Sequence, residues 1–278
     1  MAQQPRLKLN DGTTIPQLGF GVWQVPPETT ADIVGEALRT GYVSIDTAEG
    51  YRNERGVGDA VQNGDIGRDQ LYITSKLRNG AHGYDDAMRA FDQTMAELQL
   101  DVLDLFLIHW PLPKQGKYLE AWKALVEMQK SGRVRSIGVS NFNPDHLERI
   151  IGETGVVPAV NQIELHPTFQ QRAARDFHAR HNIVIESWSP LGQGQDLNDP
   201  GIAEIARKHG KTPAQVIIRW HLDQGLVVIP KSVTPSRIRE NFAVLDFKLD
   251  AEDLQRIAAL DDPKGRIGSD PAVADHRF

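Results

Sequence analysis

The sequence of 278 residues contains no cysteine, which excludes disulfides, catalytic thiolates and cysteine-ligated metals. Nowhere do about 18 apolar residues follow one another, so the sequence predicts no membrane span. The net charge of −6 comes with both signs interspersed and no lysine–arginine tract, which argues against nucleic acid or an anionic membrane as partner. Residues 1–19 lack the apolar run of a signal peptide. Together these absences favour a cytoplasmic globular protein.

Short apolar runs alternate with helical patterns along the whole chain. Most of the runs lack strict polar–apolar alternation, as expected for strands of a parallel sheet that are buried on both faces. This alternation predicts either an eight-stranded barrel or a doubly wound sheet. No break in composition divides the chain, so we expect one domain over residues 1–278. The predicted strands are 18–23, 42–46, 71–76, 103–109, 134–141, 159–165, 183–189 and 226–232.

Three further segments do not belong to this alternation. Asn10-Asp11-Gly12 between extended flanks predicts a hairpin before the first barrel strand. Residues 201–210 predict an extra helix between the seventh strand and its partner helix, and residues 251–260 predict another after the eighth unit.

Polar residues stand at or just past the end of most predicted strands. In a parallel barrel all of these ends meet at one face, where barrel enzymes place their sites, whereas in a doubly wound sheet they spread along an edge. The residues are Asp46, Lys76, His109, Ser140, Asn141, Gln162, Trp188, Lys231 and Ser232.

The first of these residues form a chemically meaningful set with Tyr51. A buried Lys76 needs a partner, and Asp46 is the obvious one. A cation beside the Tyr51 hydroxyl favours the phenolate, so we expect the pKa of Tyr51 to be lowered toward working pH. An imidazole nearby, that of His109, can orient and polarise a carbonyl oxygen. Such a set suits protonation of an oxygen that has just received a hydride on its carbon.

The chain as a whole resembles the aldo-keto reductase superfamily, and the bacterial 2,5-diketo-D-gluconate reductase branch most closely. The resemblance is carried, in order, by "IDTAEGYRNE", "LYITSK", "LIHWP", "GVSNF", "NQIELHP", "ESWSPL" and "IPKSVTPSRIREN". It implies a single (β/α)8 TIM barrel and an NADPH-dependent, monomeric carbonyl reductase for small α-dicarbonyls and keto-sugar acids such as 2,5-diketo-D-gluconate. It also implies that Tyr51 is the general acid, that Asp46 and Lys76 tune it, and that His109 orients the carbonyl.

The segment "PKSVTPSRIREN" predicts an anion site. It reads as a helix capped by Thr234 with Pro235 in its first position, and Arg237 and Arg239 lie in its first two turns. Cations at a helix start are unfavourable because they oppose the helix dipole. An anion bound at the helix start removes this conflict. The resemblance makes this anion the 2′-phosphate of NADPH. Thr234 stands where some relatives carry a further arginine, so use of NADH stays open.

The resemblance further implies which residues contact the rest of the cofactor and the substrate. Ser140, Asn141 and Gln162 would bind the nicotinamide carboxamide, Trp188 would stack on the ring, and Asn241 would lie near the adenine. The full set of implied cofactor contacts is Gly21, Val22, Trp23, Ser140, Asn141, Gln162, Trp188, Ser189, Leu191, Lys231, Ser232, Val233, Thr234, Arg237 and Asn241. The implied substrate contacts are Trp23, Tyr51, His109 and Trp110, with the tail 268–278 shaping the pocket.

Other interpretations compete with an enzyme of this kind. A metal-dependent barrel hydrolase would need clustered ligands such as an H-x-H pair, and the sequence has none. A non-catalytic nicotinamide-binding regulatory protein could use the same barrel, although it would not need all four polar groups. We expect His166 to be structural, and His82, His178 and His221 to lie in loops or on helix surfaces.

Overall fold

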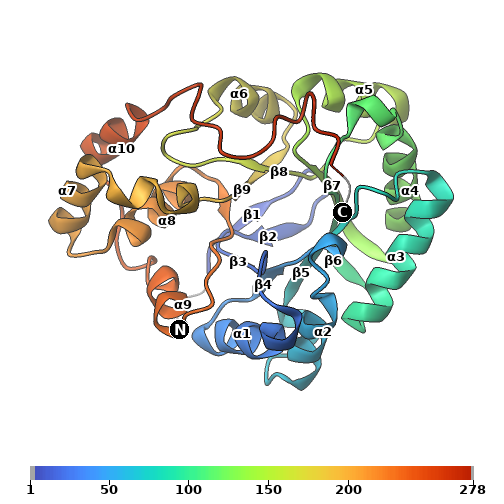
Figure 1. The fold of residues 1–278 in the computed structure, drawn as a ribbon, viewed down its shortest axis with the longest axis horizontal. Helices are drawn as coiled ribbons and strands as arrows, with labels where there is room; N and C mark the ends of the chain where they lie inside the picture. Colours follow the sequence, from blue (N-terminus) through green and yellow to red (C-terminus); the bar gives the residue numbers. More distant parts are fainter. Residues whose placement is uncertain (1–3, 277–278) are drawn as a thin grey trace.

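The computed structural model describes residues 4–276, and these residues form a closed parallel barrel (Figure 1). The strands follow one another in the order β10-β9-β8-β7-β6-β5-β4-β3, and a parallel bridge from Leu18 to Val228 joins the two edges. This closure selects the barrel over the doubly wound sheet. The strands are β3 Phe20–Gly21, β4 Ser44–Asp46, β5 Tyr72–Leu77, β6 Leu103–Ile108, β7 Val134–Ser140, β8 Val160–Glu164, β9 Val184–Trp188 and β10 Val227–Val228.

Helices surround the barrel, and several begin where the sequence signals a start. Proline occupies the first turn of five of them, including α5, α8 and α9, where its fixed φ suits the helix. The two helices expected in addition to the regular units are present as α7 and α10. The helices are α1 Pro27–Thr40, α2 Glu54–Asn63, α3 Tyr84–Leu98, α4 Tyr118–Lys130, α5 Pro144–Thr154, α6 Arg172–Arg180, α7 Pro200–His209, α8 Pro213–Asp223, α9 Pro235–Phe242 and α10 Ala251–Ala258.

The predicted hairpin closes the end of the barrel where the strands begin. Strands β1 (Arg6–Lys8) and β2 (Thr14–Pro16) pair antiparallel around Gly12, whose φ of 90° suits a residue without a side chain. The Asn10 side chain donates a hydrogen bond to the Pro158 carbonyl, 2.9 Å away, just before β8. Leu9 and Ile15 of the hairpin pack against the inward-facing Leu105 and Leu107, so the hairpin covers this end of the barrel.

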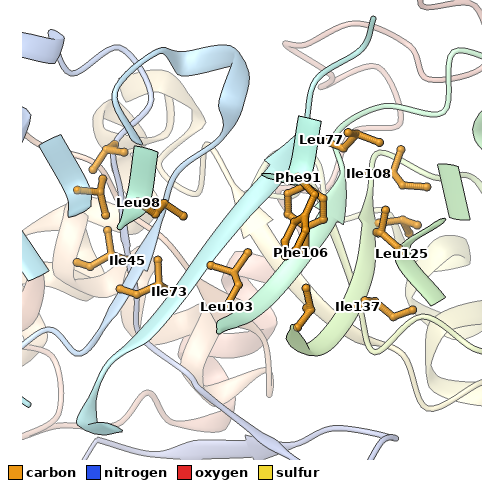
Figure 2. Close-up of a cluster of buried hydrophobic side chains, with 14 of the residues drawn as sticks. Ile45, Ile73, Leu77, Phe91, Leu98, Leu103, Phe106, Ile108, Leu125 and Ile137 are labelled. Carbon is orange, nitrogen blue, oxygen red and sulfur yellow. The ribbon is translucent and has the colours of Figure 1, made fainter. Parts of the chain in front are cut away.

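Apolar side chains on the outer face of the barrel pack against the helices (Figure 2). Phe106 of β6 meets Phe91 of α3 with ring centroids 5.0 Å apart, and Leu125 of α4 continues the layer. Burial of such rings provides much of the hydrophobic free energy of folding. This core fixes the position of β4, β5 and β6, from which the site residues project. Within residues 4–276, no helix has both the length and the apolar character that crossing a bilayer requires.

Candidate active site

Adjacent strands bring Asp46 and Lys76 together inside the barrel mouth. Asp46 ends β4 and Lys76 lies in β5, with the Lys76 Nζ 2.6 Å from Asp46 Oδ1. The same ammonium donates to the Thr47 carbonyl at 2.9 Å, and its side chain has no exposed surface. A buried carboxylate at a strand end is therefore explained by the buried cation beside it.

Tyr51 reaches the same ammonium from a short 3-10 helix, Glu49–Tyr51, that follows β4. Its hydroxyl lies 3.4 Å from Lys76 Nζ, and its ring meets the His109 imidazole edge to face at 5.6 Å. Tyr51 keeps partial exposure, whereas His109 is buried. The structure thus gathers Asp46, Tyr51, Lys76 and His109 at one place, with the phenol on the side that a substrate can reach.

The electrostatics of this group differ from the sequence-based expectation in one respect. Burial raises the pKa of Tyr51, and the opposing effect of Lys76 does not overcome it. The prediction that Lys76 brings the pKa of Tyr51 down toward working pH is therefore wrong for this state of the protein, in which Tyr51 keeps its proton. Burial would lower the pKa of Lys76, but Asp46 and Tyr51 raise it overall, so Lys76 is charged. Burial and the Lys76 charge hold the pKa of His109 well below its usual range, so the imidazole is neutral.

A second carboxylate, Glu186 of β9, lies next to this group and was not foreseen. The Gln162 Nε2 donates to Asp46 Oδ2 at 2.8 Å and to Glu186 Oε2 at 2.9 Å. Because both amide hydrogens point at carboxylates, the Gln162 carbonyl oxygen is directed elsewhere. Burial first, and then the Asp46 charge, raise the pKa of Glu186 to about 8. The signal for Glu186 was present in the sequence as a lone acid within the buried run 183–189.

The residues expected around the nicotinamide form a continuous hydrogen-bonded chain. Asn141 adopts a left-handed backbone (φ 62°), and its amide donates to the His109 carbonyl at 3.0 Å. The Trp188 indole donates to Asn141 Oδ1 at 2.8 Å, and the Ser140 hydroxyl donates to the backbone carbonyl of Gln162 at 2.8 Å. These side chains are held in fixed orientations beside the four polar residues.

The start of α9 has free capacity for an anion. Thr234 occupies the N-cap position with Pro235 directly after it, as predicted, but its side chain makes no capping hydrogen bond. Uncapped N–H groups at a helix start suit a bound anion. Lys231 and Arg237 are exposed, whereas Arg239 is paired with Glu36 of α1. This donor set fits a phosphate, and it matches the cations that the sequence assigned to the 2′-phosphate.

The remaining predicted cofactor residues lie before and within α9 and directly after β9. Ser232 and Asn241 are buried, whereas Val233 is exposed. Ser189 and Leu191 follow β9, with Ser189 in a left-handed conformation (φ 47°).

On the other side of the mouth, Gly21 pairs with Asp46 in the sheet. The next residue, Val22, donates to the Asp46 carbonyl at 3.1 Å. Asn53, which was not foreseen, donates to the carbonyls of Val22 and Val25 and so holds this segment.

The expected substrate side combines exposed and buried aromatic rings. Trp23 is 45% exposed, and Trp110 is buried against Leu112 and Ala274. The tail passes over this ring, with His276 edge to face on Trp110 at 4.7 Å. The last two residues of the predicted tail lie outside the described residues.

Other features of the chain lie away from the site. A cavity of about 980 Å³ opens between the hairpin, α6 and the start of β9, near the closed end of the barrel, and none of the predicted site residues lines it. His82 lies in the loop between β5 and α3, as expected, although it is buried. His178 of α6 and His221 of α8 are buried, so their expected position on helix surfaces is wrong. They are enclosed by contacts between elements distant in sequence, such as the one from His178 to Asn161 at 2.8 Å.

Comparison with known proteins gives one consistent family. The Aldo/keto reductase family model matches residues 16–262. The methylglyoxal reductase DkgA of Escherichia coli is 53% identical over 273 residues, which are 98% of each chain. An aldo-keto reductase of Mycolicibacterium smegmatis is 53% identical over 267 residues, covering 96% of this chain and 97% of that protein. The structure of a mutant of Gox0644 in complex with NADPH is 55% identical with a TM-score of 0.96, covering 99% of this chain and 100% of that one. The chain therefore belongs to the aldo/keto reductase family.

Proposed function

We propose that this protein reduces small α-dicarbonyls and keto-sugar acids with NADPH, and that Tyr51 is the proton donor. As an aldo/keto reductase, the chain is an NADP-dependent oxidoreductase. The observation that carries the proposal is the Lys76 ammonium, which bonds to the Asp46 carboxylate and to the Tyr51 hydroxyl at once. A charged donor aimed at a phenol supports the loss of that phenol's proton.

The chain's own residues account for the proton transfer. When bound, NADPH supplies the hydride that adds to the carbonyl carbon. Tyr51 donates its proton to the oxygen as this becomes negative, and Lys76 stabilises the resulting phenolate. Asp46 keeps Lys76 charged and in place. The neutral His109 serves as a hydrogen-bond donor that orients the carbonyl, since its low pKa keeps it from competing as an acid.

The proposed NADPH contacts agree with the donor set described above. Lys231, Ser232 and Arg237 provide charge and hydrogen bonds for the 2′-phosphate at the uncapped start of α9. The side-chain oxygen of Gln162, Oε1, is directed away from Asp46 and Glu186 and can accept from the carboxamide N–H₂. Trp188 offers a ring face for stacking, held by its bond to Asn141. The other implied contacts complete the path between these two ends.

The proposed substrate class rests on similarity. The Escherichia coli relative, named a methylglyoxal reductase, shares 53% of its residues over nearly the full length. Keto-sugar acids are included because the sequence resembles the diketo-gluconate branch.

The proposal is tested by following nicotinamide absorbance with the purified protein. NADPH, and separately NADH, is mixed with methylglyoxal, diacetyl, 2,5-diketo-D-gluconate and simple aldehydes. We expect NADPH oxidation with a preference for the dicarbonyls. Tight NADPH binding without turnover on any carbonyl contradicts the proposal and favours the regulatory alternative.

A further inference from the structure

A second group of buried charges lies at the end of β8, around His166. The His166 side chain has no exposed surface, and its Nε2 lies 3.2 Å from Glu164 Oε1. On the other side of the ring, Nδ1 lies 3.2 Å from Asp196 Oδ2 and 3.0 Å from Thr168 Oγ1. Both carboxylates are also buried. An imidazole thus stands between two acids that water does not reach.

The hydrogen bonds around His166 require a proton on each ring nitrogen. The Thr168 hydroxyl donates to Asp196 Oδ1 at 2.7 Å, so its oxygen is free to accept from Nδ1. Glu164 carries no hydrogen to offer to Nε2 when it is ionised, and its pKa is lowered by hydrogen bonds from His166, Ile267 and Gly268 although burial opposes this. Burial would lower the pKa of His166, but the bonds to Asp196 and Glu164 raise it to about 8. His166 is therefore an imidazolium at neutral pH.

One of the two acids belongs to the loop between β9 and α7, residues 189–199, which we call the cofactor loop. This loop contains Ser189 and Leu191, two of the proposed NADPH contacts. Asp196 opens a 3-10 helix, Asp196–Asn198, and its side chain is turned inward while Gln193 and Gln195 are exposed. The hydrogen bond that Asp196 accepts from Thr168 and its ion pair with His166 attach the cofactor loop to the end of β8.

The other acid holds the tail segment, residues 262–268, which crosses the barrel mouth near β8 (Figure 1). Glu164 accepts the backbone N–H groups of Ile267 and Gly268, the latter at 2.9 Å. Gly268 is packed so tightly on Trp188 that a Cβ there would come within 2.4 Å of the ring. The position of the tail segment therefore determines the room available to Trp188.

We propose that charged His166 is a positioning residue that fastens the cofactor loop and the tail segment to β8, and thereby sets the affinity for NADPH. The proposal rests on the proposed function for the contacts of Ser189, Leu191 and Trp188 with the cofactor. When His166 loses its proton, two buried carboxylates face a neutral ring, so the attachment weakens. This contribution is complete below the ordinary pKa of histidine and disappears as pH rises through about 8.

Two further ionisable side chains, those of His221 and Arg266, lie near His166. His221 of α8 is buried, which lowers its pKa to about 4, so it stays neutral. Arg266 of the tail segment lies over the Phe169 ring at 4.8 Å, and that ring is 6.1 Å from His166.

The first experiment measures NADPH affinity by fluorescence titration at about pH 6.5 and about pH 9.5, on either side of the histidine transition. Wild type is compared with His166→Gln and with the control His181→Gln, a histidine on Phe177 outside this group. We expect wild type and control to lose about tenfold in affinity for NADPH at the higher pH. This is the effect expected if NADPH binding and the pKa of His166 are linked by about one pKa unit. His166→Gln should bind weakly at both values. If it keeps the pH dependence of wild type, the proposal is wrong.

A further readout separates positioning from a general structural role. With NADPH saturating at the lower pH, single-turnover reduction by His166→Gln should stay within about threefold of wild type, because the residue does not touch the reacting atoms. If the substitution lowers the rate of hydride transfer by as large a factor as it lowers the NADPH affinity, a role limited to positioning is contradicted.

The second experiment uses wild type alone, and so does not depend on whether the variant folds. Hydrogen exchange without cofactor, corrected for intrinsic rates, should show protection of residues 189–199 and 262–268 falling above about pH 8, while α3 is unchanged. Unchanged protection overturns the proposal. If protection falls but NADPH binds at no pH, the fastening role stands and the proposed function fails.

Discussion

The ammonium of Lys76 lies 2.6 Å from a carboxylate oxygen of Asp46, and neither side chain is more than 3% exposed. Two charges buried in this way are costly unless each neutralises the other. The pair has a role in the proposed reaction, because Lys76 also donates a hydrogen bond to the Tyr51 hydroxyl.

Breaking the pair from one side should destabilise the protein. Lys76→Met leaves Asp46 buried without its cation, and we expect a loss of about 3–5 kcal/mol in the free energy of unfolding. Urea denaturation measures this loss. The double variant Asp46→Asn/Lys76→Met should recover part of it, since neither partner is then charged. A single variant as stable as wild type would contradict the pairing.

Glu186 should make stability fall as pH rises. Its pKa is about 8 in the folded protein, against an ordinary value near 4.5, so between these values the folded state holds a proton that the unfolded state has released. Stability therefore decreases by about 1.4 kcal/mol per pH unit over this window from this group. Glu186→Gln should flatten the dependence in denaturation curves from about pH 5 to about pH 8. Parallel curves for variant and wild type would show that Glu186 is ionised throughout.

Arg237 should distinguish NADPH from NADH. If its guanidinium binds the 2′-phosphate, Arg237→Ala weakens NADPH by about tenfold to a hundredfold, the value of a hydrogen bond between charged groups, and leaves NADH almost unchanged. Arg239→Ala is the matched control, because Arg239 lies on the same helix but is paired with Glu36. Equal losses for both cofactors, or equal losses in the two variants, would remove Arg237 from the phosphate site.

Much of the fold and the position of the four central residues could be predicted from local patterns. Apolar runs specify the strands, and a polar residue at a strand end such as Asp46 marks the open face of a parallel barrel. The start of α9 could be predicted because Pro235 favours the first helical position through its fixed backbone φ alone.

What could not be predicted depends on contacts between distant segments. Glu186 is connected to the site by the side chain of Gln162, which donates hydrogen bonds to both Glu186 and Asp46. His166 was expected to be structural, but no sequence pattern places Asp196 beside it. The pKa of Tyr51 depends on how far burial outweighs the Lys76 charge, and that balance requires coordinates.

The most direct test of the account compares Tyr51→Phe with wild type in single-turnover reduction of methylglyoxal, with NADPH affinity measured in parallel. The substitution removes the hydroxyl that lies 3.4 Å from Lys76 Nζ and leaves the ring against His109. We predict that NADPH binds with unchanged affinity while reduction slows by a factor of about 10²–10⁴, the usual contribution of a general acid. Reduction at the wild-type rate would contradict the assignment of Tyr51 as the proton donor.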